Sequence, residues 1–221
     1  MDERKRKKAK LFSFKYLFYD FVKVTGGIPG LIWFRPKFVY QSKSAKKKIR
    51  GGALVIANHV SKVDPVYVMI GIWYRRHHFV ATKELFNGKF LNLLFKGFMC
   101  IPVDRENFSF STFKEIVRHL EGGDMVTMFP EGKINTGDDL QAFKSGVVHM
   151  ALKADAPVVP IYVKKRKNFL QRLVFAIGEP IDLSSYYGAR PNKQEIGELT
   201  QMLFDAEKQL EELACNGKKR G

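Results

Sequence analysis

Cysteine is scarce in this sequence. The 221 residues include two cysteines, Cys100 and Cys215, which lie far apart. Disulfide-stabilised secreted domains need several cysteines, and cysteine-based zinc or redox sites need closely spaced pairs. The sequence has neither pattern, so we expect two free thiols in a reducing compartment.

Long apolar runs are also missing. A transmembrane helix needs about 20 consecutive apolar residues, whereas Lys15, Asp20 and Lys23 interrupt the most aromatic segment, residues 11–40. No small-residue cleavage site follows an unbroken apolar core, as it does in a signal peptide. We therefore expect neither a membrane span nor a signal peptide.

Acidic residues are in the minority. Lysine and arginine number 38 against 22 aspartates and glutamates, which gives a net charge of +16. Such an excess predicts an anionic partner: nucleic acid, an anionic membrane or a negatively charged substrate. Basic clusters at residues 4–10 and 43–50 flank the aromatic segment, and each basic side chain near an anionic leaflet contributes about 1 kcal/mol. This distribution favours a membrane surface over nucleic acid.

Residues 1–50 are therefore expected to form a basic, amphipathic segment that associates with a membrane. The run at residues 26–30, Gly-Gly-Ile-Pro-Gly, predicts a break between two short helices. Apolar side chains recur at helical spacing on the first helix: Leu11, Phe14, Phe18, Phe21 and Val22. An aromatic-rich pair of helices is typical of monotopic insertion into one leaflet. The alternative is that this face packs on the protein's own core.

Short apolar runs alternate with helical patterns over residues 51–214, which we expect to form one domain. The expected strands are 54–57, 78–81, 99–103, 125–129, 158–163 and 173–177. The expected helices are 65–74, 88–98, 108–120, 144–154 and 193–214. This alternation predicts an α/β fold: a mixed, largely parallel sheet flanked by helices, preceded by the amphipathic two-helix segment. Residues 215–221 form a basic tail.

One motif carries the most chemistry: Asn58-His59-Val60-Ser61-Lys62-Val63-Asp64-Pro65. It follows a short apolar run, so a buried strand is expected to deliver His59 and Asp64 into a loop that opens a helix. A neutral imidazole accepts a proton near pH 7, and a carboxylate can orient it and stabilise the imidazolium. The pair therefore predicts a base that activates a hydroxyl for acyl transfer. In isolation, Asp64 before Pro65 is also typical of a carboxylate that caps the helix.

Three further motifs follow along the chain: Ile101-Pro102-Val103-Asp104-Arg105, Phe129-Pro130-Glu131-Gly132-Lys133 and Ala156-Pro157-Val158-Val159-Pro160. Together with the first motif, they resemble the sequence blocks of the lysophosphatidic acid (1-acylglycerol-3-phosphate) acyltransferase family, which shares them with glycerol-3-phosphate acyltransferases. The resemblance spans residues 53–163. It implies that family's fold and the transfer of a fatty acyl group from acyl-CoA or acyl-carrier protein to the free hydroxyl of lysophosphatidic acid. The implied product is phosphatidic acid, in phospholipid biosynthesis.

The resemblance also implies roles for individual residues. His59 is the general base and Asp64 its partner, in a direct attack that needs no covalent enzyme intermediate; positioned base catalysis contributes about 10²–10⁴-fold. Glu131 binds or orients the acceptor's hydroxyls or orders its loop, unless it only closes the loop by accepting backbone N–H groups. Gly132 permits a conformation or a close approach that a Cβ would block. Backbone N–H groups in the loop from Pro130 to Lys133 are candidates for stabilising the oxyanion.

Cations should meet the acceptor's phosphate, and the resemblance implies Arg105, Lys83 and Lys133. Here the sequence departs from the family pattern. The family commonly carries Thr-Arg-Ser after Glu-Gly, whereas this chain continues with Lys133, Ile134 and Asn135. The family's arginine falls on Ile134, which cannot bind phosphate, and lysine does not reproduce the bidentate fork of arginine. Either Lys133 substitutes, or the acceptor is another lysophospholipid or lyso-lipid.

No cofactor and no metal ion are expected, because no pair of histidines shares metal-ligand spacing with a suitable third residue. The histidines are His59, His77, His78, His119 and His149. Residues 75–78, Arg-Arg-His-His, are expected at a solvated helix end or on a basic face toward the membrane.

The expected partners are an anionic bilayer surface, a lysophospholipid acceptor and the thioester donor, with no nucleic acid. The expected location is the cytoplasmic face of the cell membrane, as a peripheral or monotopic protein. The alternative of a different class is a non-catalytic basic protein that binds membranes or nucleic acid.

Overall fold

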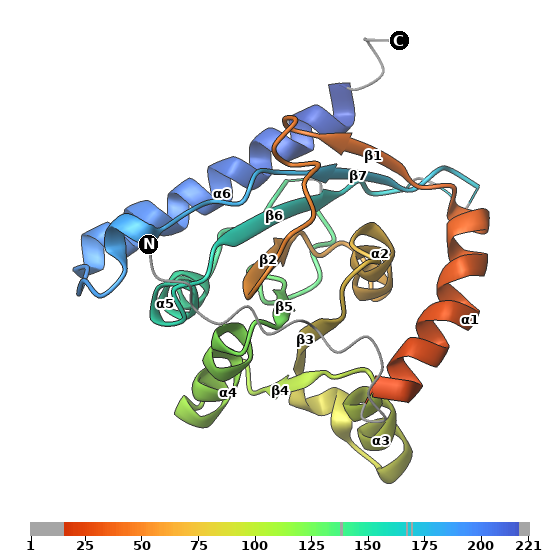
Figure 1. The fold of residues 1–221 in the computed structure, drawn as a ribbon, viewed down its shortest axis with the longest axis horizontal. Coiled ribbons are helices and arrows are strands. Elements are labelled where there is room, and N and C mark those ends of the chain that lie inside the picture. Colours follow the sequence, from red (N-terminus) through yellow and green to blue (C-terminus); the bar gives the residue numbers. More distant parts are fainter. Residues whose placement is uncertain (1–15, 138, 167, 169, 217–221) are drawn as a thin grey trace.

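A sheet of seven strands forms the centre of the fold (Figure 1). The computed structural model describes residues 16–137, 139–166, 168 and 170–216. The strands are β1 (Lys37–Tyr40), β2 (Ala53–Ala57), β3 (His77–Thr82), β4 (Ile101–Val103), β5 (Met125–Met128), β6 (Val158–Val163) and β7 (Val174–Ile177). The helices are α1 (Leu17–Phe34), α2 (Asp64–Gly71), α3 (Lys89–Gly97), α4 (Phe110–Glu121), α5 (Gly146–Lys153) and α6 (Lys193–Asn216).

The strand order is β1-β7-β6-β2-β5-β3-β4, and all neighbouring pairs are parallel except β6 with β7. This confirms the predicted mixed, largely parallel sheet. β2 lies between β5 and β6, and all five of its residues are buried. A continuous apolar sequence is typical of a parallel strand that is covered on both faces, which explains why residues 53–57 include no polar side chain.

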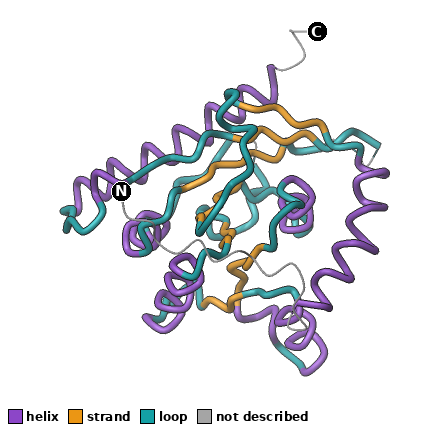
Figure 2. The backbone as a smooth tube through the Cα atoms, viewed as in Figure 1, coloured by secondary structure: helices purple, strands orange, loops and turns teal. Residues whose placement is uncertain are grey.

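Helices cover both faces of the sheet, and Figure 2 shows them on either side of the strands. Leu54 and Ile56 of β2 belong to an apolar cluster with residues of α4, α5 and α6. Ala53, Val55 and Ala57 belong to a second cluster, which includes residues of α2. Because successive side chains of a strand point to opposite faces, one short strand supports both layers of helices.

α1 is a single helix, so the predicted break near residue 30 is wrong. Pro29 lies inside it, although proline lacks the N–H that a helix interior uses. α1 packs on α2 beside this proline: a Cβ on Gly30 would lie 3.2 Å from Ile70, so the glycine lets the two helices approach closely. Figure 1 shows α1 as an arc beside the sheet and α2. Leu11 and Phe14, on the predicted apolar face, lie outside the described residues.

The described part of the predicted apolar face lies at the surface of α1. Phe18 and Phe21 are exposed, and Val22 is half-buried. Tyr19 holds the start of the helix to the sheet, because its buried hydroxyl accepts the backbone N–H of His77 at 3.2 Å. Within residues 16–137, 139–166, 168 and 170–216, no helix is long and apolar enough to cross a membrane.

The sheet begins before residue 51. Residues 37–40 form β1, which pairs in parallel with β7, and Phe38 stacks on Phe175 with the ring centroids 5.4 Å apart. The expected boundary at residue 51 therefore does not coincide with the start of the sheet. The local sequence does not reveal β1, because its pairing partner, β7, lies more than 130 residues farther along the chain.

Two histidines that were expected at a solvated helix end are buried in β3. His77 and His78 expose 0% and 5% of their surface, so that prediction is wrong. His77 Nδ1 lies 2.7 Å from Thr127 Oγ1, and its Nε2 lies 3.2 Å from the carbonyl oxygen of Ile72. Burial lowers the pKa of His77 to about 3, so this ring stays neutral at pH 7. Partners that are distant in sequence satisfy both ring nitrogens, which a local pattern cannot show.

Candidate active site

The carboxyl ends of four parallel strands open on one edge of the sheet. β2, β5, β3 and β4 are successive neighbours in that order. His59 follows β2, Glu131 follows β5, Lys83 follows β3 and Arg105 follows β4. In open α/β sheets, ligands bind outside the carboxyl ends of the strands. The topology therefore brings all four predicted site loops to the edge at which a substrate is expected.

His59 and Asp64 lie in contact. His59 Nδ1 is 3.0 Å from Asp64 Oδ2, and the Asp64 side chain is fully buried. The same oxygen accepts the backbone N–H groups of Val60 and Ser61, each at 2.7 Å. A carboxylate only accepts hydrogen bonds, so Nδ1 carries the proton of a neutral ring and Nε2 keeps the lone pair. This is the orientation that a general base needs.

The alternative reading of Asp64 as a helix cap is wrong. α2 begins at Asp64 itself, its N-cap position is Val63, and no side chain makes a capping hydrogen bond there. The carboxylate turns back toward the preceding loop, where it binds the imidazole and two N–H groups. Pro65 does occupy the first turn, as expected for a residue that needs no N–H partner.

Three further contacts fix the position of His59. Its ring stacks on Phe129, with ring centroids 4.2 Å apart and an interplanar angle of 20°. Its backbone N–H donates to Glu131 Oε1 at 3.0 Å, and its carbonyl oxygen accepts the N–H of Asn135 at 2.6 Å. The exposed fraction of the His59 side chain is 11%. The imidazole is therefore held rigidly and remains accessible from solvent.

Both carboxylate oxygens of Glu131 accept backbone N–H groups. Oε1 accepts from His59, and Oε2 accepts from Gln141 at 3.3 Å. Burial raises the pKa of Glu131, and these hydrogen bonds act in the opposite direction. The arrangement joins the loop after β2 to the loop after β5, as expected of a glutamate that closes and orders the loop.

Gly132 has a conformation and surroundings that favour glycine. Its φ is +73°, and a Cβ would lie 3.0 Å from Lys144 Cε. The Lys144 side chain thus lies against Gly132. The backbone N–H of Lys144 donates to the Pro130 carbonyl at 3.0 Å. The Gly132 N–H donates to the Phe129 carbonyl at 3.0 Å, so this member of the expected oxyanion group is already engaged. Sequence reasoning missed Lys144 because it placed this residue in a helix, whereas α5 begins at residue 146.

The three predicted phosphate-binding cations lie at different distances along the edge. Lys133 follows β5, the direct neighbour of β2, whereas Arg105 follows β4, which is three strand spacings, or roughly 14 Å, from β2. Arg105 and Lys133 are exposed. Lys83 Nζ lies 2.5 Å from Asp104 Oδ2, so its charge is partly balanced. In the strand order, Lys133 thus follows the strand next to β2, whereas Lys83 and Arg105 follow strands two and three positions away.

Two asparagines that the motif analysis did not assign hold the site together. The fully buried Asn58 donates to the Val163 carbonyl at 3.0 Å and accepts the Val163 N–H at 2.7 Å, which joins the ends of β2 and β6. Asn135 Oδ1 accepts the Gly137 N–H at 2.9 Å and the Gln141 amide at 3.2 Å. The sequence Asn-Thr-Gly at residues 135–137 is a recognisable turn signal, and it could have identified Asn135.

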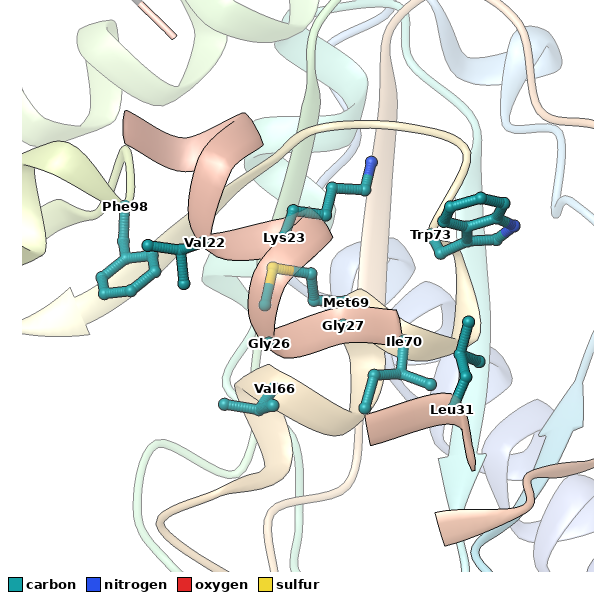
Figure 3. Close-up of a pocket in the computed structure, with 10 residues that line it drawn as sticks. All are labelled: Val22, Lys23, Gly26, Gly27, Leu31, Val66, Met69, Ile70, Trp73 and Phe98. Carbon is teal, nitrogen blue, oxygen red and sulfur yellow. The ribbon is translucent and has the colours of Figure 1, made fainter. Parts of the chain in front are cut away.

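An apolar cavity of about 140 Å³ lies between α1 and α2. Figure 3 shows its lining residues: Val22, Lys23, Gly26, Gly27, Leu31, Val66, Met69, Ile70, Trp73 and Phe98. Val66, Met69 and Ile70 belong to α2, whose first residue is Asp64, so the cavity lies beside the helix that carries the carboxylate of the site. Phe98, which directly follows α3, also lines this cavity.

Comparison with known proteins places these features in context. Residues 37–164 match the family model described as Acyltransferase. The chain is 30% identical over 165 residues to the 1-acyl-sn-glycerol-3-phosphate acyltransferase of Bacillus subtilis, a match that covers 72% of this chain and 81% of that protein. It is 29% identical over 186 residues to the Escherichia coli protein of the same name, covering 76% and 74%.

A solved structure shares the fold. The crystal structure of the 1-acyl-sn-glycerophosphate (LPA) acyltransferase, PlsC, from Thermotoga maritima superposes with a TM-score of 0.63 at 20% sequence identity. The match covers 94% of this chain and 82% of that chain.

Proposed function

The chain belongs to the acyltransferase family, and from this membership we propose that it acylates the free hydroxyl of lysophosphatidic acid to form phosphatidic acid. The donor is an acyl thioester, acyl-CoA or acyl-carrier protein. The relatives named above support the acceptor. The observation that carries the chemistry is the 3.0 Å contact between His59 Nδ1 and the buried Asp64 carboxylate at the carboxyl edge of the sheet.

In the proposed reaction, His59 Nε2 takes the proton of the acceptor's hydroxyl as the hydroxyl oxygen attacks the thioester carbonyl carbon. The resulting tetrahedral oxyanion collapses, the C–S bond breaks, and the leaving thiolate takes the proton from the imidazolium. Asp64 stabilises the imidazolium while it exists. Positioned base catalysis contributes about 10²–10⁴-fold. No residue of the chain forms a covalent bond with the acyl group.

The acceptor's phosphate is proposed to meet the exposed cations of the same edge. Lys133 is the nearest of the predicted three to His59 in the strand order, and Arg105 with Lys83 extends the positive charge across the edge. Glu131 is proposed to act by ordering the loop around His59, because both of its oxygens accept backbone N–H groups. Ile134 leaves another lysophospholipid acceptor as the second candidate, since it replaces the family's arginine with an apolar side chain.

The cavity between α1 and α2 is proposed to hold part of the acyl chain. Its lining is apolar apart from Lys23, whose Nζ turns away to the Arg75 carbonyl at 3.2 Å. An alkyl chain buried in such a cavity gains about 0.8 kcal/mol for each methylene removed from water. A cavity of this kind would make the turnover depend on chain length.

We propose that α1 and α3 attach the protein to the cytoplasmic surface of an anionic membrane without crossing it. Large apolar side chains are exposed on both helices: Leu17, Phe18, Phe21, Val24, Ile28, Ile32 and Trp33 on α1, and Phe90, Leu91 and Leu93 on α3. Groups of exposed large apolar side chains mark interaction surfaces. The net charge of +16 favours a leaflet that carries anionic lipids.

A thioester assay on vesicles tests the proposed function. The purified protein is incubated with labelled palmitoyl-CoA or palmitoyl-carrier protein and a panel of lysolipids in anionic vesicles. We expect labelled phosphatidic acid, and His59→Ala should abolish turnover with an unchanged circular dichroism spectrum. His149→Ala, an exposed histidine on α5, is the matched control and should remain active. Normal turnover by His59→Ala would refute the mechanism, whereas preference for another lysolipid would refute only the acceptor.

A further inference from the structure

Three metal-ligand side chains meet outside the candidate active site. His78, His119 and Asp124 each offer one ligand atom, and these atoms all lie within 4.8 Å of one another. His119 Nδ1 is 2.9 Å from Asp124 Oδ2, and His78 Nε2 is 3.5 Å from the same oxygen. We propose that these three residues form a binding site for a divalent transition-metal ion, with Zn²⁺ as the best match.

The ligand set and its spacing suit zinc. Zinc sites with three protein ligands commonly combine histidine nitrogens with a carboxylate and leave the fourth tetrahedral position to water. Bonds of 2.0–2.1 Å in a tetrahedron place ligand atoms about 3.3 Å apart. The two separations from Asp124 Oδ2, 2.9 Å and 3.5 Å, lie on either side of that value. The third separation, between the two histidine nitrogens, is at most 4.8 Å, so the imidazole rings would move by up to roughly 1.5 Å to reach the tetrahedral spacing.

Rigid backbone holds the three residues in place. His78 lies in β3, where it pairs with Val126 of β5. His119 lies in the last turn of α4, and the Asp124 N–H donates to the His119 carbonyl at 2.9 Å. Gly123, with φ +88°, makes the reversal that brings Asp124 back beneath the helix. Sites built on helices and strands are more precise than sites on loops; two of the three residues lie on such elements, and Asp124 lies in the short turn between α4 and β5.

Exposure and charge fit an open cation site. The His78 and His119 side chains expose 7% and 15%, whereas Asp124 exposes 41%, so the carboxylate side provides an entry path and room for a water ligand. Arg75, three residues before His78, donates to backbone carbonyls of Ile49, Gly51 and Gly123. That guanidinium donates to carbonyl oxygens and lies close enough to Asp124 to act on its charge, while the Asp124 carboxylate contacts the two imidazoles.

The site lies at the opposite edge of the sheet from His59. His78 is near the start of β3, and Asp124 immediately precedes β5, whereas His59 follows the end of the parallel strand β2. A metal there would not reach the reacting atoms. Its role would be structural: it would tie the end of α4 to β3 and β5, and binding to the folded state alone would raise the unfolding temperature.

Metal binding to the full-length, metal-stripped protein tests the proposal. Calorimetric titration with Zn²⁺ should give one equivalent, and Co²⁺ should show the strong visible absorption of a tetrahedral site. His119→Gln and Asp124→Asn should each weaken Zn²⁺ binding more than about 100-fold, beyond the 10–100-fold typical of outer partners. His149→Gln, exposed on α5, should bind as the unchanged protein does.

Two outcomes would overturn the proposal. One is Zn²⁺ binding of equal strength in His119→Gln and in the unchanged protein, which would indicate an adventitious surface site. The other is that Co²⁺ added to the unchanged protein shows only the spectrum of the hydrated ion. This measurement does not depend on the folding of any variant. The cluster would then be a hydrogen-bonded group only. Zinc should raise the unfolding temperature while leaving the rate of thioester consumption unchanged, which separates this site from the proposed catalytic one.

Discussion

Asp64→Asn separates the charge of Asp64 from its hydrogen bonds. One oxygen, Oδ2, accepts all three of them: His59 Nδ1 at 3.0 Å and the N–H groups of Val60 and Ser61 at 2.7 Å each. The other oxygen, Oδ1, is buried without a hydrogen-bond partner in the described part of the chain. An asparagine can therefore keep its carbonyl oxygen at the Oδ2 position and place its NH₂ group at the Oδ1 position. The loop and the imidazole tautomer should then both persist.

The expected loss follows from the charge alone. A hydrogen bond to a charged group contributes about 1.5–3 kcal/mol, against about 0.5–1.5 kcal/mol for a neutral pair. The difference of about 1–1.5 kcal/mol falls on the imidazolium of the transition state, which corresponds to a decrease in kcat of about 5- to 13-fold. His59→Ala removes the base and should lose about 10²–10⁴-fold. Asp64→Ala removes all three hydrogen bonds, so it should be at least as inactive as Asp64→Asn and should unfold at a lower temperature than the unchanged protein.

Release of free thiol from acyl-CoA, followed with lysophosphatidic acid in vesicles, measures these rates. Circular dichroism checks that each variant is folded. Asp205→Asn, an exposed aspartate on α6, makes the same chemical change away from the site and should retain full activity. If folded Asp64→Asn were as inactive as His59→Ala, or as active as the unchanged protein, the reasoning from a single shared oxygen would be refuted.

Three further predictions use other features of the structure. Glu207 is fully buried without a hydrogen-bond partner among the described residues, and burial raises its pKa well above the usual value. The folded state thus binds a proton that the unfolded state releases, so the free energy of unfolding should fall by up to about 1.4 kcal/mol per pH unit above the usual glutamate pKa. Glu207→Gln should remove this slope in thermal melts from pH 5 to 8. Parallel pH profiles of the unfolding temperature for Glu207→Gln and the unchanged protein would contradict the prediction. Gly132→Ala should lower kcat, because φ is +73° and the new Cβ would lie 3.0 Å from the Lys144 side chain. Gly188→Ala, with φ +75° and open space around it, is the control and should lose stability only. Equal kcat values in the two variants would contradict the proposed role of Gly132 in the site. Gly26→Leu should shift donor preference toward shorter acyl chains, because Gly26 lines the cavity and a Cβ there meets nothing within 4 Å. Gly197→Leu on α6 is the control, and an unchanged chain-length profile would exclude that cavity.

Most helices and strands of residues 51–214 could be predicted from the sequence, because their apolar spacing is a local property. β5, β6 and α6 lie within two residues of the expected ranges. The candidate site could be anticipated for a topological reason. Because the strands are parallel, the loops that follow them lie at the same edge of the sheet, formed by the carboxyl ends of the strands. That edge therefore carries His59, Glu131, Lys83 and Arg105.

Other features depend on contacts between segments that are far apart in the sequence. α1 continues through Pro29 and packs on α2 at Gly30, and β1 exists because β7 pairs with it. His78 and Asp124 meet only when β3 lies beside β5. The direction of the Asp64 carboxylate also depended on the fold, since a residue before proline fits a cap as well as it fits a buried acceptor.

The sequence by itself determined the α/β class, the family and the residues that carry the proposed chemistry, because apolar periodicity and short motifs are written in neighbouring positions. Only the tertiary structure decided which oxygen of Asp64 holds His59, where Lys144 lies, and which histidines are buried together. Those outcomes depend on distances across the sheet, and the free energy of burying and pairing polar groups is set by neighbours that the chain brings together only when it folds.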